Sequence, residues 1–272
     1  MHLAASFAEK WKEKNKDIQG VRYMLKSFGI TDKGKVRKDN QDSFIIEKCE
    51  AKSSMIVALC DGMGGAKAGG LASQISNKAF VSYIYAKLTS RTNRVINYSR
   101  ILKEACAEAN GVAYEYSLFD EAYKGMGTTI VGGVIKSSGN GYIINVGDSR
   151  AYHISRRGNS IYQITRDHSL VEELVEVGAI TKEQAKSHPQ KNVITRALGS
   201  EPEVEADYFE FTLQSGDFLL LCSDGLSNMI NDLEMLDYAK EYHDPELLCR
   251  ALLRKALNRG AKDNVTVVAV MR

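Results

Sequence analysis

The stretch MIVALCDGMGG, residues 55–65, is an apolar run that ends at an aspartate and a glycine-rich turn. The run is too short for a core helix, and the turn sequence that bounds it predicts a buried strand. The same arrangement returns in FLLLCSDG, residues 218–225. The two stretches therefore predict two buried strands, each of which places an aspartate at the end of a sheet.

Other short runs are rich in valine, isoleucine, tyrosine and phenylalanine and are bounded by turn residues, as strands are. They lie at residues 43–48, 128–136, 142–146, 151–155, 161–165, 204–213 and 265–271. Only a turn separates several of these predicted strands from the next, which favours antiparallel pairing.

Three longer segments predict helices that cover the strands. Residues 71–88 and 101–118 have apolar side chains at helical spacing. The third helix can be capped by Asp244, with Pro245 at its first position, and it ends before Gly260. The order shows no regular β-α-β alternation, so the fold class is α+β, with two mostly antiparallel sheets and helices outside them.

Composition excludes several classes of protein. The 272 residues include 36 Lys and Arg against 34 Asp and Glu, a formal net charge of +2. That balance gives no electrostatic reason to expect nucleic acid or an anionic membrane as a partner. No apolar run is long enough to span a membrane, and five scattered cysteines favour reduced thiols. We therefore expect a cytoplasmic protein.

Two parts of the chain stand outside the layered pattern. Residues 1–20 contain alternating lysines and lack the apolar core of a signal peptide, so they predict a tail or a surface helix. The remaining residues, 21–272, are predicted to form a single domain. Residues 167–195 predict two short helices, one capped near Ser169 and one with a Thr181–Gln184 capping box. We expect this segment to be a surface excursion and a candidate flap.

Aspartates stand at the ends of five predicted strands: Asp42, Asp61, Asp148, Asp224 and Asp263. Taken singly, each is better explained as a turn or capping residue, because Asp-Gly is a common turn and aspartate caps helices well. The set is harder to explain in this way, because a sheet brings strand ends together and the loops there commonly contain functional residues.

Four such carboxylates about 5 Å apart would repel by roughly 3 kcal/mol for each pair at an effective dielectric of about 20. The sum exceeds the stability of a typical domain, so the cluster must bind cations or protons. The candidates offer only oxygen, which favours Mg²⁺ or Mn²⁺ over Zn²⁺. Two such ions suit in-line attack on phosphorus, and the nearby Arg37 is a fork-shaped cation for phosphate.

Seven short motifs resemble, in order, those of the metal-dependent PPM (protein phosphatase 2C-type) serine/threonine phosphatases of bacteria. They are TDKGKVRKDNQD (31–42), DGMGG (61–65), GTT (127–129), NVGDSR (145–150), TRALG (195–199), SDGL (223–226) and KDNVT (262–266). One Asp-Gly pair is weak evidence, whereas the ordered set over roughly residues 22–271 is specific. The resemblance implies a four-layer α-β-β-α sandwich with a binuclear metal centre at one end.

The resemblance also implies ligands for two core ions. It implies Asp61, Asp224 and Asp263 on the first ion. It implies Asp42, Asp61 and the Gly62 carbonyl around the second. Both ions would be Mn²⁺ or Mg²⁺.

The implied chemistry is a direct displacement, in which a hydroxide that bridges the two ions attacks phosphorus. Arg37 would bind the substrate phosphate, and Arg37, Asp61 and Asp224 would be the catalytic residues. Acids matching Asp148 and Asp224 bind a third, weaker ion in bacterial members. The implied substrates are phosphoserine and phosphothreonine proteins, including a partner Ser/Thr kinase, and we expect a monomer.

Three residues depart from family patterns. Met63 stands where animal members have a histidine proposed as general acid, and methionine cannot donate a proton, although it is usual in the bacterial branch. Ala66 replaces a histidine of many bacterial relatives, and Gln41 replaces an acid of animal members.

The alternative function is a catalytically silent PPM-like fold that binds phosphoproteins. Loss of a metal-binding acid or of Arg37 would favour this alternative. None of these residues is lost.

Overall fold

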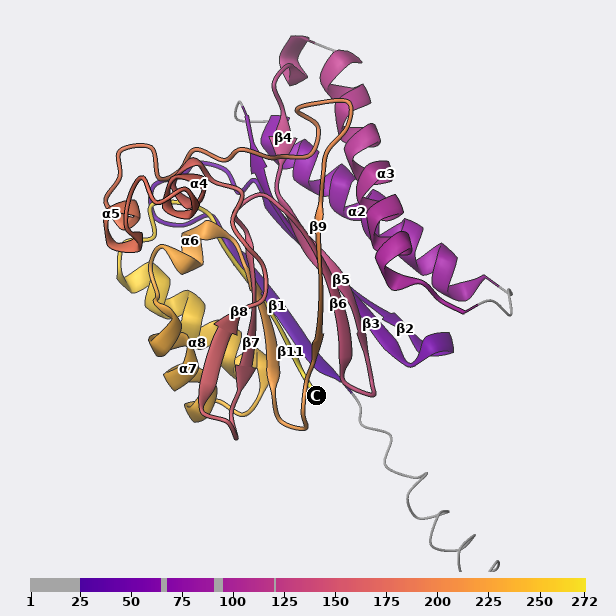
Figure 1. Cartoon of the computed structure of the whole chain (residues 1–272), viewed down its shortest axis with the longest axis vertical. Coiled ribbons are helices and arrows are strands. Elements are labelled where there is room, and N and C mark those ends of the chain that lie inside the picture. Colours follow the sequence, from indigo (N-terminus) through magenta and orange to yellow (C-terminus); the bar gives the residue numbers. More distant parts are fainter. Residues whose placement is uncertain (1–24, 65–67, 91–94, 120) are drawn as a thin grey trace, which may run out of the picture.

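The structure is a computed structural model that describes residues 25–64, 68–90, 95–119 and 121–272. Two antiparallel sheets lie between two layers of helices (Figure 1). One sheet has the strand order β1-β11-β10-β7-β8, and the other has the order β2-β3-β5-β6-β9 with β4 paired to β3. The predicted α+β class and four-layer sandwich are confirmed.

The bounds of the elements are as follows. The first sheet contains β1 (Lys26–Asp32), β7 (Arg150–Ser155), β8 (Ser160–Gln163), β10 (Phe218–Cys222) and β11 (Val265–Met271). The second contains β2 (Asp42–Cys49), β3 (Ser54–Met63), β4 (Gly127–Thr128), β5 (Ile130–Lys136), β6 (Asn140–Val146) and β9 (Asp207–Thr212). The helices are η1 (Glu50–Lys52), α2 (Ala68–Thr89), α3 (Tyr98–Phe119), η2 (Glu121–Tyr123), α4 (Leu170–Glu176), α5 (Lys182–Lys186), α6 (Asp224–Ser227), α7 (Asp232–Glu241) and α8 (Pro245–Asn258).

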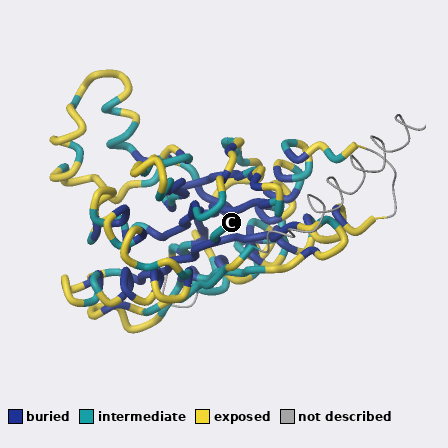
Figure 2. The backbone as a smooth tube through the Cα atoms, turned by 90° about the horizontal axis from the view of Figure 1, so that it is seen from below, coloured by how far each residue is buried: buried dark blue, intermediate teal, exposed yellow. Residues whose placement is uncertain are grey.

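Strand β3 shows why its sequence is apolar without alternation. Successive side chains of a strand point to opposite faces, and both faces of β3 are buried. Ile56 and Ala58 pack in the core beneath α2 and α3, whereas Val57 and Leu59 pack in the core between the two sheets. A third core lies between the first sheet and the helices α7 and α8. Buried residues accordingly concentrate in the central strands (Figure 2).

The structure contains several elements that the sequence patterns did not predict, and β1 and α7 are the longest of them. β1 is an edge strand whose apolar run is interrupted by Gly29, where a side chain would lie 2.4 Å from the Phe44 ring. α7 has a mixed composition, although an Asn231–Glu234 capping box marks its start. The strand predicted at 128–136 is interrupted at Thr129, whose main chain turns to bond with Asp61. Other predicted elements are present, with ends that agree or are shifted by at most three residues.

The segment 167–195 contains α4 and α5, and both predicted caps are present. Ser169 Oγ accepts a hydrogen bond from the Glu172 N–H, and Thr181 forms the capping box with Gln184. The segment returns to its starting point through a bridge between Ser169 and Ile194. The predicted N-terminal tail or surface helix over residues 1–20 lies outside the described residues. Within them, no helix has the length and apolar character needed to cross a bilayer.

Candidate active site

The five candidate aspartates come from strand ends in both sheets. Asp42 and Asp61 stand opposite each other in the β2–β3 register. Asp148 follows β6, Asp224 begins α6 directly after β10, and Asp263 precedes β11. Asp61 experiences the charges of the other four. The structure therefore brings all five together at one end of the sandwich.

Asp42 links the two sheets. Its Oδ2 accepts hydrogen bonds from Ser223 Oγ at 2.8 Å and from Thr266 Oγ1 at 2.6 Å, both from the first sheet's end. Its Oδ1 is buried, and no hydrogen-bond partner for that atom lies in the described part of the chain. Because a buried acceptor without a donor costs free energy, Oδ1 marks a place for a cation or a proton.

The main chain of Asp61 is fixed by two threonines. Its N–H donates to Thr129 Oγ1 at 3.0 Å. Its carbonyl accepts from the Thr129 N–H and from Thr128 Oγ1, each at 2.9 Å. Thr129 Oγ1 also lies 2.7 Å from Ser149 Oγ, beside Asp148. The Gly-Thr-Thr motif thus positions two of the acids, a role that the sequence-based site assignment missed.

Asn264 holds the loop that contains Arg37. Its Oδ1 accepts from the Gln41 N–H at 2.9 Å, and its Nδ2 donates to the Lys33 and Asp39 carbonyls, each at 3.0 Å. Arg37 Nη2 then lies 2.7 Å from Asp263 Oδ2. The predicted phosphate-binding arginine is therefore at the aspartate cluster. Asn264 was not predicted as a site residue, although it lies within the last quoted motif.

Gly62 is held by close contact with α2. A side chain at Gly62 would lie 2.1 Å from the Gly69 carbonyl oxygen, so only glycine allows this approach. The Gly62 N–H also donates to the Gln41 carbonyl at 3.2 Å. These contacts place the Gly62 main chain beside Asp61 and the start of α2.

Burial and mutual repulsion raise the pKa values of the acids. Burial, followed by the charge of Asp42, raises the pKa of Asp61 well above its ordinary value. Burial, with Asp148 and Asp263 nearby, raises the pKa of Asp224 to about 7. Burial and the charge of Asp167 raise the pKa of Asp148 to about 6. The site favours protons or cations over bare carboxylates.

These shifts predict a pH-dependent stability of the metal-free protein. A carboxyl whose pKa is raised in the fold stabilises the protein below about pH 4 and loses that contribution as the pH rises through its folded pKa. In EDTA we therefore expect the unfolding free energy to fall by a few kcal/mol between about pH 4 and 7. Thermal unfolding at several pH values measures this. Mn²⁺ should reverse the fall, and a loss of the same size in Asp224→Asn would contradict the assignment to Asp224.

The residues present fit divalent cations. The ligand atoms are carboxylate and carbonyl oxygens, which hard ions prefer, and Asp42 Oδ1 is buried without a hydrogen-bond partner among the described residues. Among the described residues, no three His, Cys, Asp or Glu side chains already stand in ligand geometry. Arg37 instead pairs with Asp263. An ion bound by Asp263 Oδ2 would compete with Arg37 for that oxygen.

His168 lies at the start of the predicted flap and is almost fully buried. Its Nδ1 accepts from the Gly147 N–H at 3.1 Å, and its Nε2 lies 3.3 Å from Asp207 Oδ2. Burial lowers the pKa of His168, which favours the neutral ring that the Gly147 contact requires. Both ring nitrogens of His168 thus have polar partners, and through the Gly147 contact His168 supports the Gly147–Asp148 turn.

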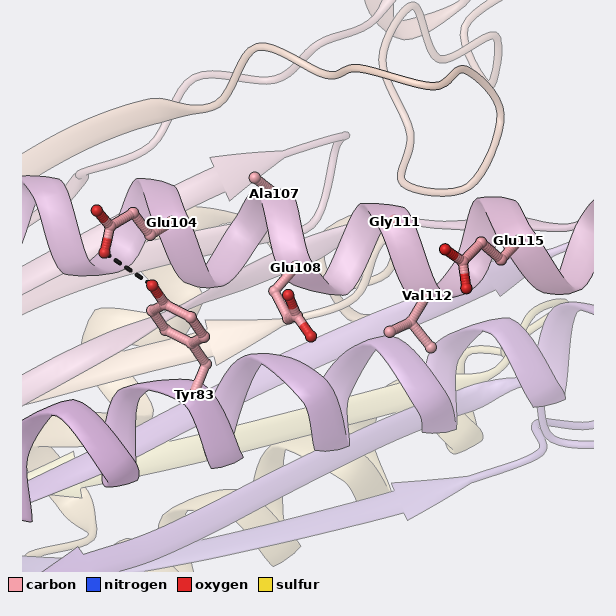
Figure 3. Close-up of a pocket in the computed structure, with 7 residues that line it drawn as sticks. All are labelled: Tyr83, Glu104, Ala107, Glu108, Gly111, Val112 and Glu115. Atoms are coloured by element: carbon pink, nitrogen blue, oxygen red, sulfur yellow. Dashed lines mark hydrogen bonds between the residues drawn. The ribbon is translucent and has the colours of Figure 1, made fainter.

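A hollow of about 540 Å³ lies between α2 and α3 (Figure 3). Its lining residues are Tyr83, Glu104, Ala107, Glu108, Gly111, Val112 and Glu115. Glu104 accepts a hydrogen bond from the Tyr83 hydroxyl at 2.8 Å and pairs with Arg100. The hollow is on the outer helical layer and contains none of the candidate site residues.

A model of the family described as Protein phosphatase 2C matches residues 34–259. The chain belongs to the protein phosphatase 2C family. It is 38% identical over 246 residues to the serine/threonine phosphatase stp of Listeria welshimeri, covering 89% of this chain and 94% of that protein. It is 36% identical over 243 residues to the protein phosphatase PhpP of Streptococcus pneumoniae, covering 89% and 95%.

Solved structures of the protein phosphatase 2C family have the same fold. The serine/threonine phosphatase Stp1 of Staphylococcus aureus matches with a TM-score of 0.81 and 36% identity, covering 92% of this chain and 95% of that one. The catalytic domain of PstP, solved in complex with 2 manganese ions, matches with a TM-score of 0.75 and 30% identity, covering 91% and 97%. This chain is therefore an enzyme, a protein phosphatase of the 2C type, and its family is metal-dependent.

Proposed function

We propose that this phosphatase hydrolyses phosphoserine and phosphothreonine in proteins at the aspartate cluster. The observation that supports this most directly is the convergence of five acids, with Arg37, in a member of this family. The names of its relatives specify serine/threonine phosphatases. That specificity agrees with a site that binds the phosphate group and makes few contacts to the rest of the substrate.

We infer that Asp61, Asp224 and Asp263 hold one ion and that Asp42, Asp61 and the Gly62 carbonyl hold a second. When bound, such ions acidify water and stabilise charge on phosphoryl oxygens. Manganese is supported by the PstP complex, and magnesium suits the same oxygen donors.

A third, weaker ion at Asp148 and Asp224 is part of the proposal. Among the neighbouring charges, that of Asp148 contributes most to raising the pKa of Asp224. A cation between them would relieve that repulsion. The Thr129–Ser149 contact and the His168–Gly147 contact hold the Asp148 turn in place.

The side chains of Arg37 and Met63 differ in what they can contribute to the reaction. The guanidinium of Arg37 is half-exposed and can bind two phosphoryl oxygens once Asp263 is engaged elsewhere. Met63 has no proton to give, so the leaving serine or threonine oxygen must obtain its proton from water or from another group. Residues 167–195 would form the variable flap beside this site.

We further propose that the substrates include a Ser/Thr kinase and its targets and that the enzyme acts as a monomer in the cytoplasm. The names of the bacterial relatives support phosphoprotein substrates, and the kinase is proposed from the family resemblance alone. The five cysteines are free and buried, which agrees with a reducing compartment.

The test is hydrolysis of para-nitrophenyl phosphate and of a phosphothreonine peptide in Mn²⁺, in Mg²⁺ and in EDTA. We expect turnover of both substrates with either ion and none in EDTA. Folded, metal-loaded protein without turnover would instead favour the silent interaction module, and a pull-down with phosphoproteins would follow.

Arg37→Ala is expected to raise the KM for a phosphothreonine peptide by about ten- to a hundredfold, because a charge-assisted contact of about 1.5–3 kcal/mol is lost. Steady-state kinetics in saturating Mn²⁺ measures this. Arg254→Ala, a change of another exposed arginine, is the control. Unchanged KM and kcat in Arg37→Ala would remove that residue from the phosphate site.

A further inference from the structure

A second hollow lies between the β7–β8 hairpin turn of the first sheet and the loop that connects β9 of the second sheet to β10 of the first. It has a volume of about 340 Å³ and is lined by Arg156 and Arg157, after β7, and by Ser215 and Gly216, before β10. We call this set of four residues the arginine pocket. It contains none of the candidate catalytic residues.

Strand register places the arginine pocket at the end of the sandwich opposite the aspartates. Cys222 pairs with Arg150 at the aspartate end, whereas Phe218 pairs with Ile154 next to the arginine pocket. Strands of this length, at about 3.3 Å per residue, separate the two ends by roughly 15 Å. A ligand in the arginine pocket therefore cannot share the phosphate position beside Arg37.

The two arginines of the pocket are not neutralised. Within the described residues, no carboxylate lies at ion-pair distance from Arg156 or Arg157, although most arginines there have one. The Nε of Arg156 is buried and has no hydrogen-bond partner among the same residues. A buried donor on a cation without an acceptor is costly. The positive charges of the two guanidinium groups would attract an anion into the hollow that they line.

The backbone at Gly216 lies close to the Arg156 guanidinium group. Gly216 has a φ of +88°, which favours glycine. A side-chain carbon there would lie 3.8 Å from Arg156 Nη1. The Gly216 N–H already donates to the Arg272 carbonyl at 2.6 Å, so the polar contacts left for a ligand are the guanidinium groups and the Ser215 hydroxyl.

The charged side chains beside the pocket also favour an anion. The carboxylate nearest in sequence, Asp217, is buried and faces inward, where its Oδ2 lies 2.8 Å from His153 Nε2 and accepts from the Gln214 N–H at 2.9 Å. Arg272 adds a further cation beside the same turn, since its Nη1 donates to the Leu213 carbonyl at 2.7 Å.

We propose that the arginine pocket is a second phosphate-binding site, separate from the catalytic centre. Two guanidinium forks and a hydroxyl match the tetrahedral, doubly charged phosphate group better than a planar, singly charged carboxylate. The ligand is a phosphate group, presented either by a phosphorylated protein segment or by free inorganic phosphate.

If the ligand is a phosphorylated segment, the pocket tethers substrates that have more than one phosphate. This consequence rests on the proposed function. Binding at the arginine pocket would raise the effective concentration of a second phosphoresidue at the aspartates. An extended chain covers at most about 3.6 Å per residue, so the two phosphoresidues must lie more than about four residues apart.

The test is an NMR titration of ¹⁵N-labelled, full-length protein in EDTA, which needs no turnover and so remains informative if the proposed activity fails. The probes are inorganic phosphate, a phosphothreonine peptide and the same peptide without phosphate. We expect saturable shifts of the Ser215 and Gly216 amides. In the double variant Arg156→Gln/Arg157→Gln, the dissociation constant obtained from these shifts should be at least about tenfold higher than in the wild type.

Two comparisons make the result decisive. Arg254→Gln should bind the phosphate probes with the dissociation constant of the wild type. In every variant, the chemical shifts of the Gly62 and Gly225 amides separately monitor binding at the catalytic end. Binding of inorganic phosphate alone would identify free phosphate as the ligand, and binding of the phosphopeptide would identify phosphoprotein. Shifts that rise without saturation, or equal binding by the double variant, would overturn the proposal.

Discussion

Asp224→Asn is expected to lower turnover of a phosphothreonine peptide in Mn²⁺ by well over a hundredfold. Loss of an outer-sphere partner of a metal ligand already costs about 10–100-fold, and Asp224 is proposed as a ligand itself. The fold should survive, because the substitution removes a charge from a cluster that burial and repulsion already strain. Steady-state kinetics and calorimetric Mn²⁺ titration measure the two effects.

The matched control is Asp237→Asn, which changes an exposed aspartate on α7. It should leave turnover and Mn²⁺ binding unchanged. In EDTA near pH 7, Asp224→Asn should unfold at a higher temperature than the wild type, since its neutral amide replaces a carboxyl that ionises only at a cost. Wild-type turnover in Asp224→Asn would remove this residue from the metal site.

Gly225→Ala is expected to destabilise the protein by roughly 3 kcal/mol or more, in the upper range for overpacking. The added carbon would lie 1.9 Å from the main-chain oxygen of Asn264. That oxygen belongs to the segment between Asp263 and β11, so either α6 or this segment must move. Chemical denaturation in EDTA measures the loss, and Mn²⁺ affinity should fall with it because Asp224 and Asp263 separate.

Gly111→Ala is the control for Gly225→Ala. Gly111 lies within α3, where an added carbon meets nothing within 4 Å. Alanine there should stabilise the protein by about 0.5–1 kcal/mol, because glycine is unfavourable in a helix interior. Equal stability losses in both variants would show that the Asn264 contact is not the cause.

The layers of the fold could be predicted because its strands and helices have strong local patterns. Strands buried on both faces, such as β3 and β10, appear as unbroken apolar runs. The helix α8 has an N-cap at Asp244 and a proline at its start. β1 lacked such a pattern because it is a half-buried edge strand with a central glycine. Its place depends on pairing with β11 at the other end of the chain.

The acids of the site could be predicted because each follows or precedes a recognisable strand. The residues that hold them could not be assigned in the same way. Thr129, Asn264 and Thr266 act through main-chain, side-chain amide and hydroxyl contacts that span up to 231 positions in sequence. Threonine and asparagine in a turn have many local explanations. Only the three-dimensional arrangement shows that they face Asp61, Asp39 and Asp42.

The strand order of the first sheet has a consequence for synthesis on the ribosome. β11, which follows all the other described strands in sequence, lies between β1 and β10, so neither can pair on that side until residues 265–271 have been made. The second sheet needs nothing beyond β9 and can form earlier. A nascent or prematurely terminated chain therefore presents two unpaired strand edges and lacks Asp263. Such a product is prone to aggregate, and because it lacks Asp263 we expect phosphatase activity only after β11 has been made.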